Sequence, residues 1–271
     1  MDLSIGRFHI DPATADLHNH TTYSDGLLTP AEVVQRAKGL GLSTIAITDH
    51  DGAGGIREAV TEGHRLGVTV IPGVEVSTED ENEVEFHILG YDFDPEEANM
   101  KAYLNNALAA RIARNEKLFA ALREEGYDIS ITDVMDRPDR IFIGKPNIAR
   151  VLVQKGYFEN KDQVFQDLLE RPRYKSIKKN KVTPFMAIEL ILGAGGVPVW
   201  AHPGKTRDIG EKGSPGFYKN IEEYLDRFVS AGLAGLECFH PGHDKDMADT
   251  LCTMAAERGL FITKGSDFHG D

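Results

Sequence analysis

The 271-residue sequence predicts an α/β fold in which a barrel of parallel strands carries a helical insertion. Three observations lead to this prediction. Short β-branched or apolar runs alternate with helical stretches in both end portions of the chain. The alternation stops between residues 95 and 182, and histidines and carboxylates recur where the predicted strands end. The composition, 41% hydrophobic and 27% charged, is that of a globular enzyme and excludes a disordered or fibrous chain.

Seven segments have the length and residue types of strands. They are Ala15 to Leu17, Thr44 to Thr48, Val68 to Ile71, Val84 to Leu89, Val197 to Trp200, Gly235 to Phe239 and Leu260 to Thr263.

Helices are predicted between most of these strands. Pro30 to Leu40 has a favourable start, since Thr29 is a good N-cap, Pro30 suits the first turn and Glu32 follows it. Four further segments have the same character: Gly54 to Leu66, Pro184 to Leu192, Ile221 to Ala231 and Asp246 to Arg258. This alternation is typical of parallel βα units.

Residues 95–182 are predicted to form the helical insertion, and residues 1–94 and 183–271 the barrel. The insertion contains an approximate apolar stripe from Leu104 to Leu122, then shorter helices at Pro146 to Lys155 and Lys161 to Glu170, the latter preceded by Asn160 as cap. It ends at Arg171 to Lys181, which holds six basic residues. This run is either a solvated loop or a rim that attracts an anionic substrate.

Charge and apolar patterning narrow the possible partners. The net charge of −13 and pI near 5.2 argue against non-specific binding of duplex nucleic acid. The apolar stretch Leu190 to Trp200 is too short to cross a bilayer, and Met1 to Pro12 lacks the core of a secretory signal. Two cysteines outside any C-x-x-C motif, Cys238 and Cys252, fit a reducing compartment. We therefore expect a cytoplasmic protein without membrane attachment.

Six of the ten histidines lie at or within predicted strands, most with a carboxylate nearby. They are His18, His20, His50, His87, His202 and His269, and the accompanying carboxylates are Asp25, Glu75 and Asp267. In a barrel, side chains at the carboxyl ends of parallel strands gather in one ring. Imidazole and carboxylate together suit Zn, Fe or Mn, and so many ligands exceed the capacity of one cation. The sequence predicts a centre with more than one metal ion.

The other sequence signals weigh less. His9, His64 and His240 are assigned structural roles, because each lies in a loose segment, on a charged helix surface or before a turn. No Walker, Rossmann or nucleophile-elbow motif occurs in the positions that those chemistries require.

Six motifs, in order along the chain, resemble those of the PHP (polymerase and histidinol phosphatase) superfamily of metal-dependent phosphoesterases. They are D-L-H-N-H-T-T-Y-S-D-G from Asp16, I-T-D-H-D from Ile47, P-G-V-E-V-S from Pro72, E-F-H-I-L-G-Y from Glu85, A-H-P-G from Ala201 and G-S-D-F-H from Gly265. The insertion resembles that of the branch acting on nucleotides.

The resemblance implies a distorted (β/α)7 barrel with two to three divalent ions, Mn, Zn or Fe. Three ligand sets are implied: His18, His20, Glu75 and Asp267; Glu75, His87 and His202; and Asp25, His50 and His269. Asp49 and Asp51 are similar to groups that orient a metal-bound histidine.

Substrate-side residues match that branch less closely. It carries Arg-x-His-x-x-Arg in the insertion and Arg after the A-H-P-G turn, whereas this chain has Lys145, Asn147, Arg150 and Lys205. Lysine lacks the bidentate fork of arginine, so the preferred substrate can differ. By the same resemblance, His243 binds phosphate or protonates the leaving group; a surface-loop role is the alternative.

The expected activity is hydrolysis of a small anionic phosphomonoester, such as a nucleoside 3′,5′-bisphosphate or AMP, by a metal-bound hydroxide. Lys145, Arg150 and Lys205 are expected to hold its phosphate. Three alternatives remain open: a histidinol phosphatase, an oligonucleotide exonuclease whose groove Arg171 to Lys181 would line, and a metal-binding regulatory module without turnover.

Overall fold

The computed structural model describes residues 3–135 and 142–270. Seven strands form one curved sheet in the order β3-β4-β5-β6-β7-β8-β9, which is also their order along the chain. The strands are β3 Ala15–Asp16, β4 Thr44–Ile47, β5 Thr69–Glu79, β6 Glu85–Tyr91, β7 Val197–Trp200, β8 Gly235–Phe239 and β9 Phe261–Lys264. A small hairpin of β1 (Leu3–Ile5) and β2 (Phe8–Ile10) precedes them.

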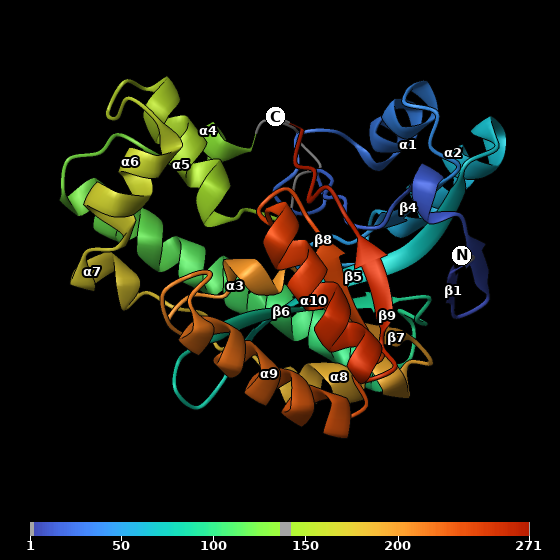
Figure 1. The fold of residues 1–271 in the computed structure, drawn as a ribbon. Helices are drawn as coiled ribbons and strands as arrows, with labels where there is room; N and C mark the ends of the chain where they lie inside the picture. Colours follow the sequence, from blue (N-terminus) through green and yellow to red (C-terminus); the bar gives the residue numbers. More distant parts are fainter. Residues whose placement is uncertain (1–2, 136–141, 271) are drawn as a thin grey trace.

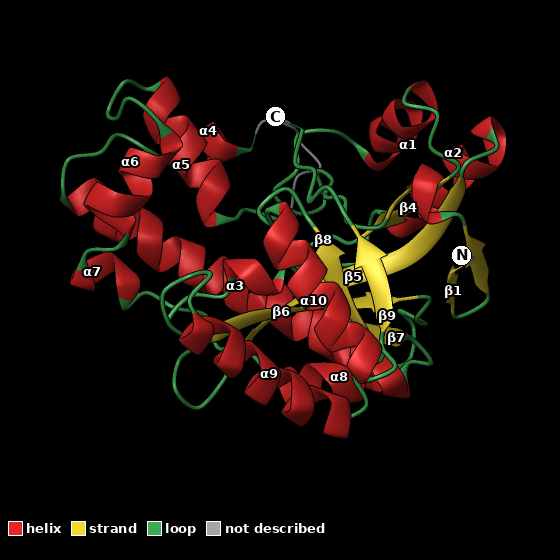
Figure 2. Cartoon of the chain, viewed as in Figure 1, coloured by secondary structure: helices red, strands yellow, loops and turns green. Residues whose placement is uncertain are grey.

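The sheet comes close to closing into a barrel. Hydrogen bonds link the chain just after β3 to the end of β9 and the residues that follow it. The backbone N–H of Leu17 donates to the carbonyl of Lys264, and the backbone N–H of His20 donates to the carbonyl of Phe268. Helices cover the outside of the sheet (Figures 1 and 2). They are α1 Pro30–Gly39, α2 Ile56–Leu66, α8 Pro184–Gly193, α9 Pro215–Ser230 and α10 Lys245–Glu257. The predicted distorted barrel is therefore confirmed.

One strand departs from the predicted parallel pattern. β6 runs antiparallel to both β5 and β7. The reason is that β5 continues through the P-G-V-E-V-S motif to Glu79, where the prediction ended at Ile71, and a tight turn then leads directly into β6. Asp80 stabilises this turn by accepting hydrogen bonds from the N–H groups of Asn82 and Val84. With no helix between them, the two strands form a hairpin.

Helix ends were predicted with mixed success. In α1 the Thr29 cap and Glu32 form the reciprocal capping box. α9 begins at Pro215, earlier than the predicted Ile221, because Ser214 caps it. The predicted helix from Lys161 to Glu170 starts at the Asn160 cap but becomes a π-helix over Phe165–Leu169.

The described residues between β6 and α8 form a helical layer with its own core. α3 (Ala98–Glu124) extends from the barrel to this layer, which contains α4 Ile131–Val134, α5 Lys145–Gln154, α6 Lys161–Val164 and α7 Pro172–Lys175. Leu118, Leu122, Ile148 and Leu168 are among its fully buried apolar side chains. Division of the chain at residues 94/95 and 182/183 stays a prediction.

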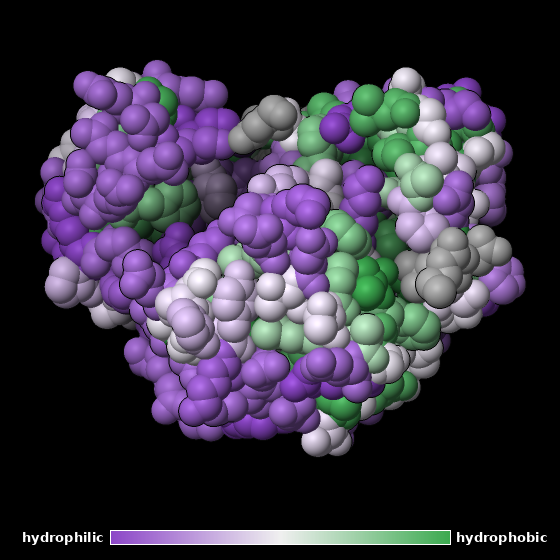
Figure 3. Space-filling view, viewed as in Figure 1, coloured by the Kyte–Doolittle hydropathy of each residue, from purple (hydrophilic) through white to green (hydrophobic). Residues whose placement is uncertain are grey.

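Figure 3 shows a hollow in the molecular surface between this helical layer and the side of the barrel bearing α1 and α2. No helix within residues 3–135 and 142–270 has the length and apolar character needed to cross a membrane.

Candidate metal centre

Glu75 lies at the centre of the histidine cluster. Its side chain is fully buried in β5, and five imidazoles lie within ion-pair distance of it. One oxygen, Oε1, is 2.8 Å from His87 Nδ1 and 2.9 Å from His202 Nε2. The other, Oε2, is 2.8, 3.3 and 3.4 Å from the nearest nitrogens of His50, His20 and His18. A single carboxylate thus contacts residues from four strands or strand ends.

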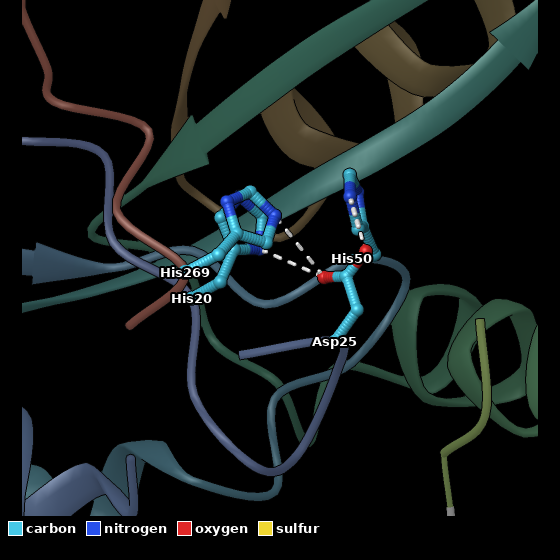
Figure 4. Close-up of side chains that lie close together, drawn as sticks. All are labelled: His20, Asp25, His50 and His269. Atoms are coloured by element: carbon cyan, nitrogen blue, oxygen red, sulfur yellow. Dashed lines mark ion pairs between the residues drawn. The ribbon is translucent and has the colours of Figure 1, made fainter. Parts of the chain in front are cut away.

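Two further carboxylates complete the cluster. Asp267 Oδ1 lies 3.2 Å from His20 Nε2 and 3.5 Å from His18 Nε2. Asp25 lies 3.3 Å from His269 Nε2 and 3.7 Å from His50 Nε2, as Figure 4 shows.

These side chains form three overlapping groups whose ligand atoms lie within 4.8 Å of one another. The groups are His18, His20, Glu75 and Asp267; His20, Asp25, His50 and His269; and His50, Glu75 and His87. They resemble the three predicted sets, with His20 and His50 each shared between two groups. His202 joins through its 2.9 Å contact with Glu75.

Several polar atoms of this cluster are buried without hydrogen bonds, an arrangement that suits metal ligands. Five buried atoms lie within ion-pair distance of other atoms of the cluster, yet none of them forms a hydrogen bond with a described residue: His18 Nε2, His20 Nε2, His50 Nδ1, Asp25 Oδ1 and Glu75 Oε2. Leaving buried polar atoms unsatisfied is costly, so groups of this kind require an ion or another ligand. The mixture of imidazole nitrogen and carboxylate oxygen suits Zn, Mn or Fe. The residues can hold several divalent ions.

Charge coupling within the cluster shifts its protonation. Burial opposes ionisation of Glu75, but the surrounding imidazoles, His87 foremost, hold the pKa of its carboxyl well below the usual range. Burial also opposes protonation of His20, yet the nearby carboxylates of Asp267 and Glu75 raise its pKa to about 10. Burial lowers the pKa of His202 to about 4 despite its contact with Glu75. Without metal, protons on some imidazoles balance the carboxylates.

Residues behind the ligands fix their orientation. Glu237 of β8, fully buried, contacts His18 Nδ1 at 3.0 Å and accepts a hydrogen bond from the His202 backbone N–H at 2.8 Å. Gly265 allows this close packing, because a Cβ there would lie 2.2 Å from His18 Cβ and 2.5 Å from Glu237 Oε1. Glu237 was not among the predicted site residues, although a single carboxylate within the apolar predicted strand Gly235 to Phe239 was a signal for it.

The two aspartates flanking His50 act on other parts of the molecule. Asp49 accepts hydrogen bonds from the backbone and hydroxyl of Thr21 and from Ser24 Oγ, and Ser24 Oγ lies 3.3 Å from His20 Nδ1. Asp51 contacts no histidine in the hydrogen bonds and ion pairs of the described residues. It instead accepts from Ser77, Tyr103 and the buried cations Arg111 and Lys179. Asp51 therefore connects the barrel to the insertion.

Two histidines differ from their predicted surroundings. His240, assigned a structural role, lies with Nε2 3.2 Å from Asp267 Oδ2 at the edge of the cluster. His243 uses both ring nitrogens on the backbone: Nδ1 donates to the Cys238 carbonyl and Nε2 accepts from the Gly204 N–H, at 2.9 and 3.0 Å. Protonation of a leaving group by His243 would require one of these bonds to open.

A cavity of about 500 Å³ opens onto the cluster. Asp25, His50, His87, His202 and Asp267 line one part of it, and Asn147, Arg150, Lys161 and Lys205 another. Of the predicted phosphate-binding residues, Arg150 and Lys205 line this cavity, and Lys205 Nζ is 2.8 Å from Asp267. Lys145 begins α5, next to the lining residues Pro146 and Asn147, and is half-buried. Lys161 also lines the cavity but was not among the predicted site residues.

The basic run Arg171 to Lys181 is largely neutralised. Arg171 and Arg173 pair with Glu125, and Arg173 also with Glu124. The four lysines of the run pair with Glu170, Glu79, Glu83, Asp51 and Glu85. The run therefore ties the insertion to itself and to the barrel, a third arrangement beyond the solvated loop and the anion-attracting rim.

Fold and site together define a distorted barrel whose mouth carries a cluster of imidazoles and carboxylates that can hold several divalent ions. Residues 16–234 match the PHP domain model, and the chain belongs to the PHP domain family.

Several known proteins are similar to this chain over most of its length. The chain is 34% identical over 262 residues to the 3′,5′-nucleoside bisphosphate phosphatase of Chromobacterium violaceum, covering 95% of this chain and 87% of that protein. It is 34% identical over 257 residues to a 5′-3′ exoribonuclease of Haemophilus influenzae, covering 94% and 89%. A crystal structure described as a metal-dependent phosphoesterase from Bifidobacterium adolescentis has a TM-score of 0.83 and 33% identity, covering 94% and 87%.

Proposed function

We propose that the protein is a metal-dependent phosphoesterase that hydrolyses a small phosphomonoester with a multinuclear metal centre. The observation that carries this proposal is a cluster of imidazole and carboxylate groups, several of whose buried atoms have no hydrogen-bond partner among the described residues, beside a cavity that is also lined by Arg150, Lys161 and Lys205. Such a cavity suits a phosphate group, since divalent ions and Arg or Lys both bind its oxygens. The relative named as a nucleoside bisphosphate phosphatase supports a phosphomonoester substrate, and the relative named as an exoribonuclease supports phosphate-ester hydrolysis in general.

We propose His18, His20, Asp25, His50, Glu75, His87, His202, Asp267 and His269 as metal ligands. When bound, the ions supply activation of water and neutralisation of phosphoryl oxygens. The protein's own residues do the rest. Arg150 and Lys205 bind the phosphate from the cavity wall, and Lys145 adds positive charge at the start of α5. Asp49 fixes the Thr21–Asp25 loop through Thr21 and Ser24.

His243 is proposed to act mainly on the Gly204 turn. Its Nε2 accepts the Gly204 N–H, so it fixes the backbone between His202 and Lys205. A direct part in protonating the departing alcohol stays a prediction, because both ring nitrogens have partners.

A nucleotide such as a nucleoside 3′,5′-bisphosphate or AMP is the proposed substrate. Digestion of a long RNA strand is less favoured, because the basic run that would line its path is paired with carboxylates. The test is a phosphate-release panel with added Mn, comparing nucleoside 3′,5′-bisphosphates, AMP, histidinol phosphate and short oligonucleotides. Preferred release from a mononucleotide is expected. Metal bound in stoichiometric amount with no release from any ester would support a binding module instead.

A further inference from the structure

His240, which follows β8, uses its two ring nitrogens on different partners. The backbone nitrogen of Gly242 lies 2.8 Å from Nδ1, and Oδ2 of Asp267 lies 3.2 Å from Nε2. A backbone N–H can only donate, so Nδ1 must accept and carries no proton. The ring proton is therefore on Nε2, where it donates to the Asp267 carboxylate.

The imidazole of His240 is held in this orientation by the turn that follows it. Its side chain is 5% exposed, and a Cβ at Gly242 would lie 3.0 Å from Nδ1, so glycine lets the turn close against the ring. The backbone N–H of His243 donates to the carbonyl of His240 and closes the same turn. The ring also lies beside that of His202, with 5.3 Å between their centres. Rotation of the ring would break the Gly242 bond and disturb this packing.

Asp267 presents its two oxygens to different surroundings. Oδ1 lies 3.2 Å from His20 Nε2 and 3.5 Å from His18 Nε2, among the proposed metal ligands. Oδ2 is the oxygen that His240 and Lys205 contact, at 3.2 and 2.8 Å. The torsion that turns a carboxylate is soft, so the donors to Oδ2 decide where Oδ1 points.

The two donors to Asp267 differ in mobility. The Lys205 side chain is 47% exposed and lines the cavity, and its ammonium ends a flexible four-carbon stem. His240 is a rigid ring that is bonded to the backbone of its own turn. A phosphate group in the cavity would compete with Asp267 for the Lys205 ammonium. Of the two donors, His240 is the one that can stay on Oδ2 when this happens.

We propose that His240 is a positioning residue, whose Nε2–H holds Asp267 with Oδ1 toward the metal ions while Lys205 moves to the substrate phosphate. The effect on metal binding needs only the metal centre, whereas the movement of Lys205 rests on the proposed function. This role goes beyond the structural one predicted for a histidine before a Pro-Gly turn, because the turn occupies only Nδ1.

Two polar substitutions separate the roles of the two nitrogens. The amide nitrogen of glutamine lies as many bonds from Cβ as Nε2, so His240→Gln keeps a donor for Asp267 and gives up the acceptor for Gly242. The amide oxygen of asparagine takes the place of Nδ1, so His240→Asn keeps the acceptor and gives up the donor. His64→Gln, on the exposed surface of α2, is the control.

The direct test measures the affinity of the metal-free protein for Zn by competition with a chromophoric chelator. His240→Asn should bind Zn roughly 10–100-fold more weakly, the loss typical of a residue that orients a ligand. His240→Gln and His64→Gln should bind Zn close to wild type. Thermal melting without metal is the second measurement, and His240→Asn should melt no lower than His240→Gln, because it keeps the bond to Gly242.

Several results would overturn the positioning role. Wild-type Zn affinity in both His240 variants would show that Asp267 does not need this donor. Equal losses in both would assign the effect to the shape of the ring. A loss in His240→Gln alone would leave His240 with the turn as its only task. A melting temperature of His240→Asn well below that of His240→Gln would make its weaker Zn binding a consequence of folding.

Turnover tests the movement of Lys205. With Mn added and adenosine 3′,5′-bisphosphate as substrate, Lys205→Met should raise KM about tenfold or more, because a charged contact to phosphate is lost. In the His240→Asn background Asp267 retains the ammonium, so Lys205→Met should raise KM by less and lower Zn affinity by more. Equal fold-changes in the two backgrounds would contradict an exchange of Lys205 between Asp267 and phosphate.

The two measurements also separate this inference from the proposed function. If the wild-type protein releases phosphate from no ester, the proposed function fails and the movement of Lys205 fails with it. The Zn competition still decides whether His240 positions Asp267, since it requires no turnover.

Discussion

The barrel mouth and the insertion differ in the kind of buried polar atom that they leave without a hydrogen bond. Among the described residues, buried atoms of His18, His20, Asp25, His50 and Glu75 at the mouth have no hydrogen-bond partner, and these are metal-ligating types. In the described part of the insertion, single donor atoms of Arg111, Arg114 and Asn147 have no hydrogen-bond partner, although Asn115 also leaves an acceptor. The two regions therefore differ in kind: the mouth leaves metal-ligating atoms without hydrogen bonds, whereas the insertion mainly leaves donors without them.

The largest expected effect is at the mouth. Glu75→Gln removes the negative charge that five imidazoles surround. Metal content and turnover should both fall, and by more than the roughly 10–100-fold loss that is typical when a residue that only orients the ligands is changed. Metal analysis of the purified variant and a phosphate-release assay measure this. Full metal content with a near-normal rate would remove Glu75 from the centre.

The next effect concerns the connection between the regions. Asp51→Asn leaves Arg111 and Lys179 buried without their shared carboxylate, and breaking such a buried ion pair costs about 3–5 kcal/mol of unfolding free energy. Urea unfolding compares the variant with wild type. A loss of unfolding free energy below about 1 kcal/mol would show that Asp51 and its two cations contribute no more than a surface ion pair.

The mouth was more predictable from the sequence than the insertion, and the reason is physical. Histidines and carboxylates at strand ends are positioned by local backbone, so His18 and His20 could be placed from spacing alone. The reversal of β6 was missed because the predicted third strand stopped at Ile71, whereas β5 continues to Glu79 and a tight turn at Asp80 leads straight into β6. Which residues would meet over long sequence separations could not be read from local patterns: Asp51 contacts Lys179 across 128 residues of sequence, and Glu237 of β8 contacts His18 across 219.

Glu237→Gln should have an intermediate effect. The variant keeps the shape of the side chain but loses the charge that orients His18 through Nδ1, so metal affinity should fall roughly 10–100-fold. Competition with a chromophoric chelator measures this affinity. Glu257→Gln, on the exposed end of α10, serves as a matched control and should bind metal as wild type does. Equal affinities in the two variants would contradict the orienting role.

Metal binding should also depend on pH, with a defined sign. The pKa of His20 is raised to about 10 without metal, so at neutral pH a proton occupies the ring that a cation must displace. Affinity should therefore rise with pH from neutrality toward about 10, by up to about tenfold per pH unit for each proton released. Titration calorimetry in buffers of different ionisation enthalpy counts those protons. No proton release at pH 7 would contradict a protonated His20.

The smallest effect is expected at the outer end of the insertion. Arg173 pairs with Glu124 and Glu125, but its side chain is 44% exposed, so water competes for both contacts. Exposed pairs of this kind contribute about 0–1 kcal/mol, and Arg173→Ala should change the unfolding free energy by no more than that. Turnover should be unaffected, because the guanidinium pairs with Glu124 of α3 and does not line the cavity. A large rise in KM for a mononucleotide would instead place this basic run beside the substrate, and would return Arg171 to Lys181 to the role of an anion-attracting rim.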